Sequence, residues 1–242
     1  MKPTPTSPPE PLLAFGAHPD DIEFGCGGVI AGETHAGRPV HFVVCSRGEA
    51  GSNGPPRQRT AEAKKAAKIL GATIEFIELD GDAHLEVRAR HAVKLAAIIR
   101  RVRPGLVLAP TPEPNQHPDH HRLGRLVRDA ARLARYGGLK ELKRLPTHAI
   151  GQLLFYAISP DAEPAGVQPV LIEISIEVIN TWIKAMGAHA SQLLTCNYPS
   201  VQLARASVNG SRCGALAAIA LFPNDAPVFG SLAPLARGAR RF

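Results

Sequence analysis

The segment LLAFGAHPDDIEFGCGG, residues 12–28, decides the fold of this chain. An apolar run over residues 12–17 predicts a buried strand, and the polar sequence HPDD, residues 18–21, follows it directly. Glycines then lead into a helix that we expect over residues 29–36. A strand, a polar loop and a helix in this order begin a βαβ unit, so the HPDD loop is expected at the carboxyl end of its strand.

The same alternation of strands and helices continues along the chain. Apolar runs and helical spacings predict a strand at 40–45, a helix at 57–70, a strand at 74–79, a helix at 89–102 and a strand at 106–109, then a loop and a further helix. Past residue 146 we expect strands at 152–158 and 170–174, and helices at 176–194 and 208–221. This order indicates an α/β fold, with a doubly wound, Rossmann-like, mostly parallel sheet flanked by helices on both faces.

We expect one large domain. The first 11 residues, MKPTPTSPPEP, are rich in proline and predict a flexible tail. Residues 12–242 then form a single domain, with a core at 12–150 and a looser part at 151–242. With 242 residues, 45% of them hydrophobic, the chain is long enough to bury a sizeable core.

Composition narrows the classes of function. Four cysteines, Cys26, Cys45, Cys196 and Cys213, lie far apart without CxxC spacing, which argues against a disulfide scaffold or a thiolate zinc cluster and favours the cytoplasm. The net charge is +7, but aromatic residues make up 5% of the chain, so we expect a small-molecule ligand rather than a nucleic acid. We find neither a secretory signal pattern nor an apolar run of about 18 residues, so no membrane association is expected.

Two loops rich in histidine and aspartate form the candidate site. HPDD, residues 18–21, follows the first strand, and HPDHH, residues 117–121, follows the fourth. If these strands are neighbours, the loops meet at one sheet edge and bring together four histidines and three aspartates. Two imidazoles with one carboxylate suit a divalent metal ion and leave coordination positions open for water, as in catalytic zinc sites. A further carboxylate, Asp20 or Asp21, is then available to take the proton of that water.

The glycines at 25, 27 and 28 do not form a dinucleotide-binding motif. The GxGxxG pattern that begins at Gly25 needs a glycine at position 30, where the chain has Ile30. Asp20, Asp21 and Glu23 also place negative charge where a pyrophosphate would bind. We expect these glycines to allow close packing of the first helix on the sheet, with Cys26 as a small buried side chain.

Together, HPDD at 18–21 and HPDH at 117–120 resemble the paired signature of the PIG-L family, also called LmbE-like de-N-acetylases, which are zinc-dependent enzymes acting on N-acetylglucosamine conjugates. The resemblance covers nearly the whole chain beyond the tail and is strongest over residues 12–125. It includes AFGA at 14–17, RGEAGSNG at 47–54, Arg59 with Glu62, and ASQ at 190–192. The subgroup that the chain most resembles is associated with bacillithiol synthesis and chitobiose deacetylation.

The resemblance assigns a role to each residue of the two loops. It implies that His18, Asp21 and His120 bind one zinc ion per chain, a donor set that also suits other divalent metals. Asp20 is implied as the general base. His117 is implied to stabilise the oxyanion or to protonate the departing amine, with Asp119 holding its ring.

Two further residues are implied to contact substrate. Arg59 matches an arginine that family members use for this purpose, and from its position at the active edge of the sheet we favour that role over a simple pairing with Glu62. Tyr198 is a candidate for a tyrosine that polarises the substrate carbonyl. An arginine found in some relatives is replaced here by Ala149. The resemblance also implies a homo-oligomer.

The predicted reaction is hydrolysis of an N-acetylated amino sugar to acetate and the free amine. The first alternative is an amidase that acts on a related sugar-thiol conjugate. A second is a non-haem iron oxygenase, because two histidines and one carboxylate also form an iron-binding triad. A third is a non-catalytic module that binds sugar or metal. The additional Asp20 and the pair His117 and Asp119 favour hydrolysis, because an iron triad needs no extra base.

Overall fold

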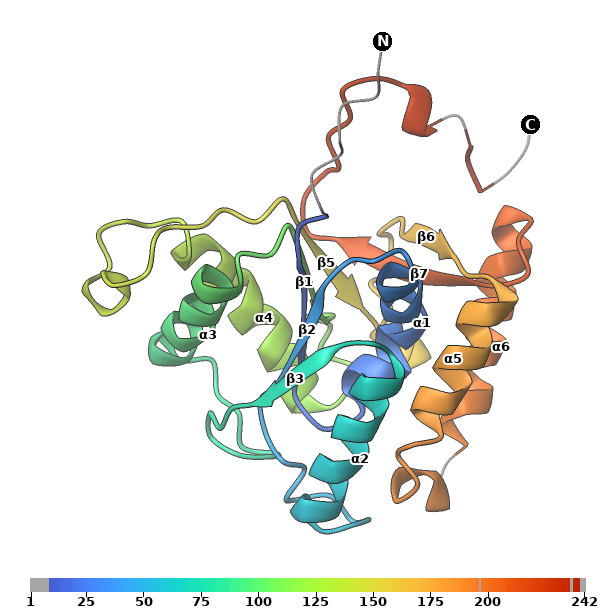
Figure 1. Cartoon of the computed structure of the whole chain (residues 1–242), viewed down its shortest axis with the longest axis horizontal. Helices are drawn as coiled ribbons and strands as arrows, with labels where there is room; N and C mark the ends of the chain where they lie inside the picture. The colour runs from blue at the N-terminus through green and yellow to red at the C-terminus, as the bar shows by residue number, and fades with distance from the viewer. Residues whose placement is uncertain (1–8, 196, 236, 240–242) are drawn as a thin grey trace.

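The strands form one sheet whose order brings the two loops together. The computed structural model of the chain describes residues 9–195, 197–235 and 237–239. Within them, seven strands form a sheet in the order β3-β2-β1-β4-β5-β7-β6 (Figure 1). They are β1 (Leu12–Gly16), β2 (Val40–Val44), β3 (Thr73–Phe76), β4 (Leu106–Pro110), β5 (Gln152–Tyr156), β6 (Val170–Glu173) and β7 (Ala218–Pro223). The first five pair in parallel, and β7 is antiparallel to both β5 and β6, as expected for a mostly parallel sheet.

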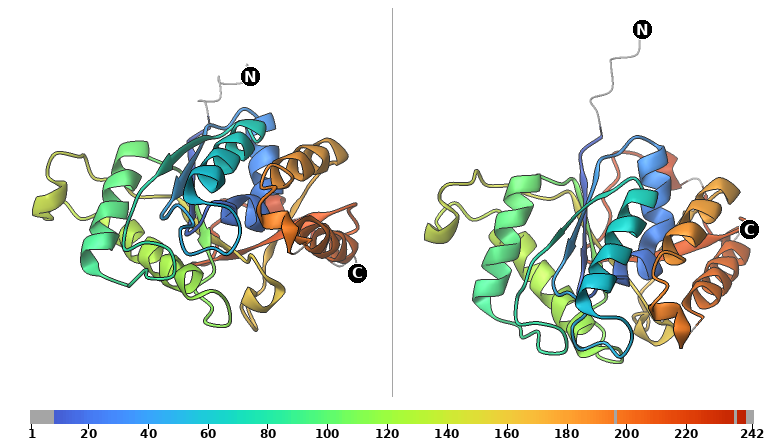
Figure 2. Two further views of the ribbon diagram at one scale, coloured as in Figure 1. Left: turned by 90° about the horizontal axis from the view of Figure 1, so that it is seen from below. Right: turned by 60° about the horizontal axis from the view of Figure 1, so that its bottom comes forward.

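Helices cover both faces of this sheet (Figure 2). They are α1 (Asp21–His35), α2 (Pro56–Ile69), α3 (Ala89–Val102), α4 (Pro118–Leu133), α5 (Ile176–Met186) and α6 (Tyr198–Cys213). Alternation along β1 divides the core in two: Leu12 and Ala14 pack in the cluster with α1 and α5, whereas Leu13 and Phe15 pack in the cluster with α3 and α4. A strand buried on both faces explains why residues 12–17 are continuously apolar. The predicted doubly wound α/β fold is confirmed.

Glycines let α1 approach the sheet closely. A Cβ atom on Gly25 would lie 2.2 Å from the Tyr156 ring, and one on Gly27 would lie 2.7 Å from the Trp182 ring. The Trp182 indole also donates a 2.7 Å hydrogen bond to the carbonyl oxygen of Glu23. Cys26 is fully buried between these glycines. The predicted packing role of the glycines is therefore confirmed.

The C-terminal part differs from the predicted elements. The helix expected at 208–221 is wrong: α6 ends at Cys213, Gly214 adopts a left-handed conformation with φ 69°, and β7 follows. The apolar run AIALF fits a helix or a buried strand equally well from its pattern alone, and here it is buried between β5 and β6. The helix expected at 176–194 ends early, at Met186. At the other end of the chain, α1 starts at Asp21 instead of residue 29.

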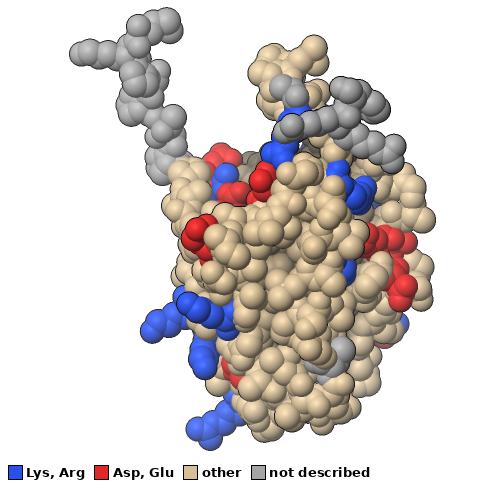
Figure 3. Space-filling model, turned by 90° about the vertical axis from the view of Figure 1, so that its right-hand side faces the viewer, with Lys and Arg blue, Asp and Glu red and all other residues tan. Residues whose placement is uncertain are grey.

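The outer surface carries its charge unevenly. The face formed by α5 and α6 has a broad area without Lys, Arg, Asp or Glu, and charged side chains lie around it (Figure 3). None of the helices in the described ranges is long and apolar enough to span a membrane. Cys26, Cys45 and Cys213 carry free thiols, while Cys196 and most of the predicted tail lie outside the described residues.

Candidate metal-centred active site

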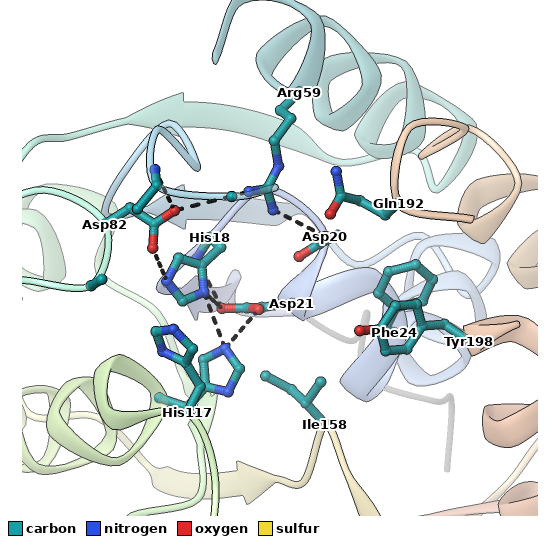
Figure 4. A pocket seen from close by; sticks show the side chains of 14 residues that line it. His18, Asp20, Asp21, Phe24, Arg59, Asp82, His117, Ile158, Gln192 and Tyr198 are labelled. Carbon is teal, nitrogen blue, oxygen red and sulfur yellow. Dashed lines mark hydrogen bonds and ion pairs between the residues drawn. The ribbon is translucent and has the colours of Figure 1, made fainter. Parts of the chain in front are cut away.

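The HPDD and HPDHH loops meet because β1 and β4 are parallel neighbours. Their carboxyl ends lie at the same edge of the sheet, where a pocket of about 250 Å³ opens (Figure 4). The pocket is lined by His18, Asp20, Asp21, Phe24, Ala50, Gly51, Arg59, Asp82, Ala83, His117, His120, Ile158, Gln192 and Tyr198. Seven of the eight residues predicted for the site line this pocket; Asp119 lies behind it and contacts His18.

The side chains of His18, Asp21 and His120 converge on one point. His18 Nδ1 lies 3.1 Å from His120 Nε2 and 3.5 Å from Asp21 Oδ2, and His120 Nε2 lies 3.0 Å from Asp21 Oδ1. Asp21 Oδ2 also accepts hydrogen bonds from the backbone N–H groups of Ala17 and His18, which fixes the carboxylate. Ligands about 2.0–2.2 Å from a tetrahedral ion are separated by roughly 3.3–3.6 Å. The pairs measured here, which use both oxygens of Asp21, are 3.0–3.5 Å apart, close to the spacing that one divalent ion needs.

Two neighbouring groupings offer further donors. The ring nitrogens of His18, His117 and His120 lie within 4.8 Å of one another, and the same holds for donor atoms of His18, Asp82 and Asp119. Two imidazole nitrogens facing each other beside a carboxylate form a borderline donor set that suits zinc and other divalent metals alike.

Asp82 and Asp119 orient His18 from the side opposite the convergence point. His18 Nε2 lies 3.0 Å from Asp82 Oδ1 and 3.4 Å from Asp119 Oδ2. Asp119 Oδ2 is itself held by the backbone N–H of Ala83, 2.7 Å away. A carboxylate on the far nitrogen of a ligating histidine fixes the ring orientation and raises its basicity.

The position of Asp119 differs from the predicted one, and Asp82 was missed. Asp119 was expected to hold the ring of His117, but its carboxylate contacts His18, and it reaches His117 Nδ1 through its backbone N–H at 3.2 Å. Asp82 follows β3 within a turn and carries no motif. Its one signal in the sequence is its place after a strand, at the same carboxyl edge as the other loops.

Asp20 has a strained backbone, and its side chain bonds to Arg59. Its φ of 126° lies in the region that non-glycine residues rarely adopt. Although Asp20 precedes α1, its side chain makes no capping hydrogen bond to that helix. Its Oδ2 instead accepts a 3.2 Å hydrogen bond from Arg59 Nη2. Strain of this kind persists where surrounding structure holds a residue in place, and it clusters at functional sites.

The adjacent carboxyl groups of Asp20 and Asp21 have opposite pKa shifts. Burial and the charge of Asp21 together raise the pKa of Asp20 to about 6. Burial alone would also raise the pKa of Asp21, but the neighbouring rings of His120 and His18 hold it well below its ordinary value. Two carboxyl groups driven apart in pKa are able to take different roles, one as a permanent anion and one as a proton acceptor.

His117 presents a proton donor to the pocket. Its Nδ1 accepts the hydrogen bond from the Asp119 backbone, so a neutral ring carries its proton on Nε2. Burial and the nearby rings of His18 and His120 lower the pKa of His117, which favours that neutral form. The fourth histidine of the two loops, His121, points elsewhere and contacts the carbonyl oxygen of Pro112.

Arg59 lies in the first turn of α2, and its side chain contacts the loop that precedes this helix. It is 5% exposed, its Nη1 donates to the carbonyl of Gly48, and its Nη2 donates to the carbonyl of Pro19 as well as to Asp20. A Cβ atom on Gly48 would lie 2.3 Å from the guanidinium, so a glycine is needed there. The predicted contact of Arg59 with substrate stays a prediction, and its observed contact is with Asp20.

Aromatic and amide side chains form the pocket wall opposite the candidate metal ligands. Tyr198, at the start of α6, stacks on Phe24 with ring centroids 5.0 Å apart, and it lines the pocket together with Gln192. Gln192 was not among the predicted site residues, although the sequence ASQ at 190–192 belongs to the resemblance described above. Ala149 is exposed and does not line the pocket.

Comparisons with known proteins find similarity to deacetylases. The family model described as PIG-L: GlcNAc-PI de-N-acetylase matches residues 13–131. A probable N-acetyl-alpha-D-glucosaminyl L-malate deacetylase of Bacillus cereus is 28% identical, over 75% of this chain and 83% of that protein. The diacetylchitobiose deacetylase of Thermococcus kodakarensis is 29% identical, over 75% and 69%.

Two other proteins are similar to this chain. The 4-oxalmesaconate hydratase of Pseudomonas putida is 27% identical, over 75% of this chain and 72% of that protein. The crystal structure of the conserved protein TT1542 from Thermus thermophilus superposes with a TM-score of 0.82 at 29% identity, covering 94% of this chain and 99% of the other. Proteins named as deacetylases and a protein named as a hydratase are therefore similar to this chain at comparable identity.

Proposed function

We propose that this chain, which belongs to the PIG-L family, uses one zinc ion to hydrolyse the acetamide of a small molecule that contains N-acetylglucosamine. The products are acetate and the free amino sugar. One observation carries the proposal: three converging donors, His18, Asp21 and His120, leave a separate carboxylate, Asp20, beside them in the same pocket. A hydrolase needs both a metal site and a base, and this pocket offers both.

The proposed metal ligands are His18, Asp21 and His120. A bound zinc ion would supply a Lewis acid and make a water molecule more acidic. Asp82 and Asp119 hold His18 so that its Nδ1 faces the other two donors. In the cell, other divalent metals compete for such a donor set.

Asp20 is the proposed base, and His117 is the proposed hydrogen-bond donor to the oxyanion. Asp20 takes a proton from the attacking water, whose oxygen bonds to the carbonyl carbon of the acetamide. Arg59 keeps the Asp20 carboxylate pointed into the pocket. The Nε2–H of His117 donates a hydrogen bond to the oxyanion. Asp20 then passes the proton that it took from water to the sugar nitrogen, and the carbon–nitrogen bond breaks. Acetate leaves with the oxygen of the water.

The hydratase relative supports a second candidate, the addition of water to a carbon–carbon double bond. A base and an activated water serve that reaction too, so the sequence motifs alone do not separate the two. A related amidase acting on a sugar-thiol conjugate and an iron oxygenase stand as further alternatives. We also retain cytoplasmic location and a homo-oligomeric state as predictions.

An acetate-release screen tests the proposal. The zinc-loaded protein is incubated with N-acetylglucosamine, diacetylchitobiose and N-acetylglucosaminyl malate, and acetate and free amine are measured together. We expect both products in equal amounts from at least one compound, and oxygen consumption at the background rate. Full zinc occupancy with no acetate from any of them would instead favour a binding module or the hydratase activity.

A further inference from the structure

A chain of hydrogen bonds fixes the orientation of the Gln192 side chain. Glu62 is a carboxylate, which accepts hydrogen bonds, so Ser191 Oγ must donate to Glu62 Oε2 at 2.6 Å. Ser191 Oγ then has its lone pairs left, and it accepts from Gln192 Nε2 at 2.8 Å. The second hydrogen of Gln192 Nε2 goes to the carbonyl oxygen of Asn53, also at 2.8 Å. Both amide hydrogens are therefore used within the protein.

The consequence is that Gln192 offers an acceptor to the pocket. With Nε2 held by Asn53 and Ser191, the opposite atom of the amide, Oε1, points toward Asp20 and the pocket interior (Figure 4). The Ser191 backbone N–H also donates to Glu62, so the segment that carries Gln192 is tied to α2. Gln192 Oε1 thus faces bound ligand as a preoriented hydrogen-bond acceptor.

Arg59 is not available to bind an anion. Its two terminal nitrogens face protein oxygens, those of Gly48, Pro19 and Asp20, and Asp82 lies 4.0 Å from Nη1. A guanidinium that recognises a substrate carboxylate needs its paired N–H groups free. Here the terminal N–H groups are directed into the loop and at the Asp20 carboxylate, and the Nε atom is buried without a hydrogen-bond partner, out of reach of a ligand.

The charged side chains that line the pocket are mostly carboxylates. Among the described residues that line it, Asp20, Asp21 and Asp82 carry carboxyl groups, and Arg59 is the one with a permanently charged basic group. A divalent ion would cancel the excess of negative charge and would leave no positive surplus to attract an anionic substrate. Carboxylates of the protein close to a substrate carboxylate would repel it.

We propose that this pocket selects an uncharged N-acetylated sugar over an anionic conjugate, and that Gln192 is a specificity-determining residue whose Oε1 accepts a hydrogen bond from a donor group of that sugar. The proposal rests on the proposed deacetylase function and names its substrate class. It places diacetylchitobiose-like sugars ahead of N-acetylglucosaminyl malate, and it disfavours the polycarboxylate substrate of a hydratase.

The test compares kinetic constants of the zinc-loaded protein on the two sugars at one ionic strength. We expect kcat/KM for diacetylchitobiose to exceed that for N-acetylglucosaminyl malate at least tenfold. In Gln192→Met, which keeps the length of the side chain without its polar atoms, loss of one neutral hydrogen bond should raise KM for the neutral sugar about 3- to 10-fold. Zinc content and kcat should stay close to those of the wild type.

Gln58→Met is the matched control. Gln58 is exposed on α2, also donates to Glu62, and does not line the pocket, so its KM should equal that of the wild type. Equal or better turnover of the malate conjugate would overturn the preference for uncharged sugars while leaving the deacetylase function intact. An unchanged KM in Gln192→Met would overturn the role of Gln192. Failure to release acetate from either sugar would instead count against the proposed function itself.

Discussion

The two sides of the pocket are built from different kinds of structure. The side with the proposed metal ligands comes from loops directly after β1 and β4, and the parallel pairing of these strands fixes where His18, Asp21 and His120 meet. The opposite wall combines Phe24 of α1, Tyr198 at the start of α6 and Gln192 between α5 and α6. A hydrogen-bond chain through Ser191 to Glu62 of α2 holds Gln192. The sheet therefore positions the proposed catalytic groups, whereas a later and less regular segment contributes to the wall that a ligand would contact.

The largest effect should follow from His18→Ala, which removes one of the proposed metal ligands. This change removes one of three converging donors and leaves Asp82 and Asp119 beside an empty space. We expect loss of bound zinc and of essentially all activity, measured by metal analysis and acetate release. His35→Ala, at the exposed end of α1, is the matched control. A variant that kept stoichiometric zinc would contradict the ligand assignment.

Asp20→Asn should separate metal binding from turnover. The amide keeps the shape of the side chain but accepts no proton, so we expect wild-type zinc content and a kcat lowered by about 10²- to 10⁴-fold. Asp161→Asn, an exposed aspartate far along the chain, serves as the control. Full activity in Asp20→Asn would rule out Asp20 as the base.

The pH profile probes the same residue. Asp20 acts as a base when it is ionised, and its pKa of about 6 lies above the ordinary value. Activity should therefore be retained above this pKa and lost as the pH falls through it, which the acid limb of kcat/KM measures. A profile that stays flat down to pH values near 4, the ordinary range of a carboxyl group, would be incompatible with this environment of Asp20.

Asp82→Asn tests whether residues behind the ligands matter. Asp82 contacts His18 Nε2 at 3.0 Å and lies outside both sequence motifs. Loss of such a partner typically weakens metal affinity or activity by about 10- to 100-fold. Zinc titration against a competing chelator measures the change. An affinity equal to that of the wild type would show that Asp119 alone suffices to orient His18.

The smallest effect should come from Tyr198→Ala on the opposite wall. Removing the ring that stacks on Phe24 should raise KM about 2- to 10-fold, the range expected for one aromatic contact, with zinc content unchanged. Tyr136→Ala removes an exposed tyrosine outside the pocket and should leave KM unchanged. A large fall in kcat with constant KM would instead assign Tyr198 to the chemistry.

The two sides of the pocket also differ in how far the sequence predicted them. The alternation of apolar runs and helices predicted β1 to β5, and with it the meeting of HPDD and HPDHH, because strand ends in a parallel sheet share one edge. Asp82 and Gln192 were missed since each depends on a fold-level contact, with His18 and with Ser191 and Asn53 respectively. The partner of Asp119 was also wrong in detail, because spacing within a loop does not determine which ring a carboxylate faces.

The C-terminal elements show the limit of pattern alone. The apolar run that forms β7 has the composition of a buried helix as well as that of a buried strand. Its antiparallel pairing with β5 and β6 makes it a strand. Tertiary pairing of this kind leaves no local mark on the sequence.

The most direct test of the metal centre is anomalous diffraction at the zinc absorption edge from crystals of the zinc-loaded protein. A single strong peak bonded to His18 Nδ1, Asp21 and His120 Nε2, with Asp20 unbound beside it, is the predicted result. A peak ligated by other side chains, or none at this edge of the sheet, would contradict it.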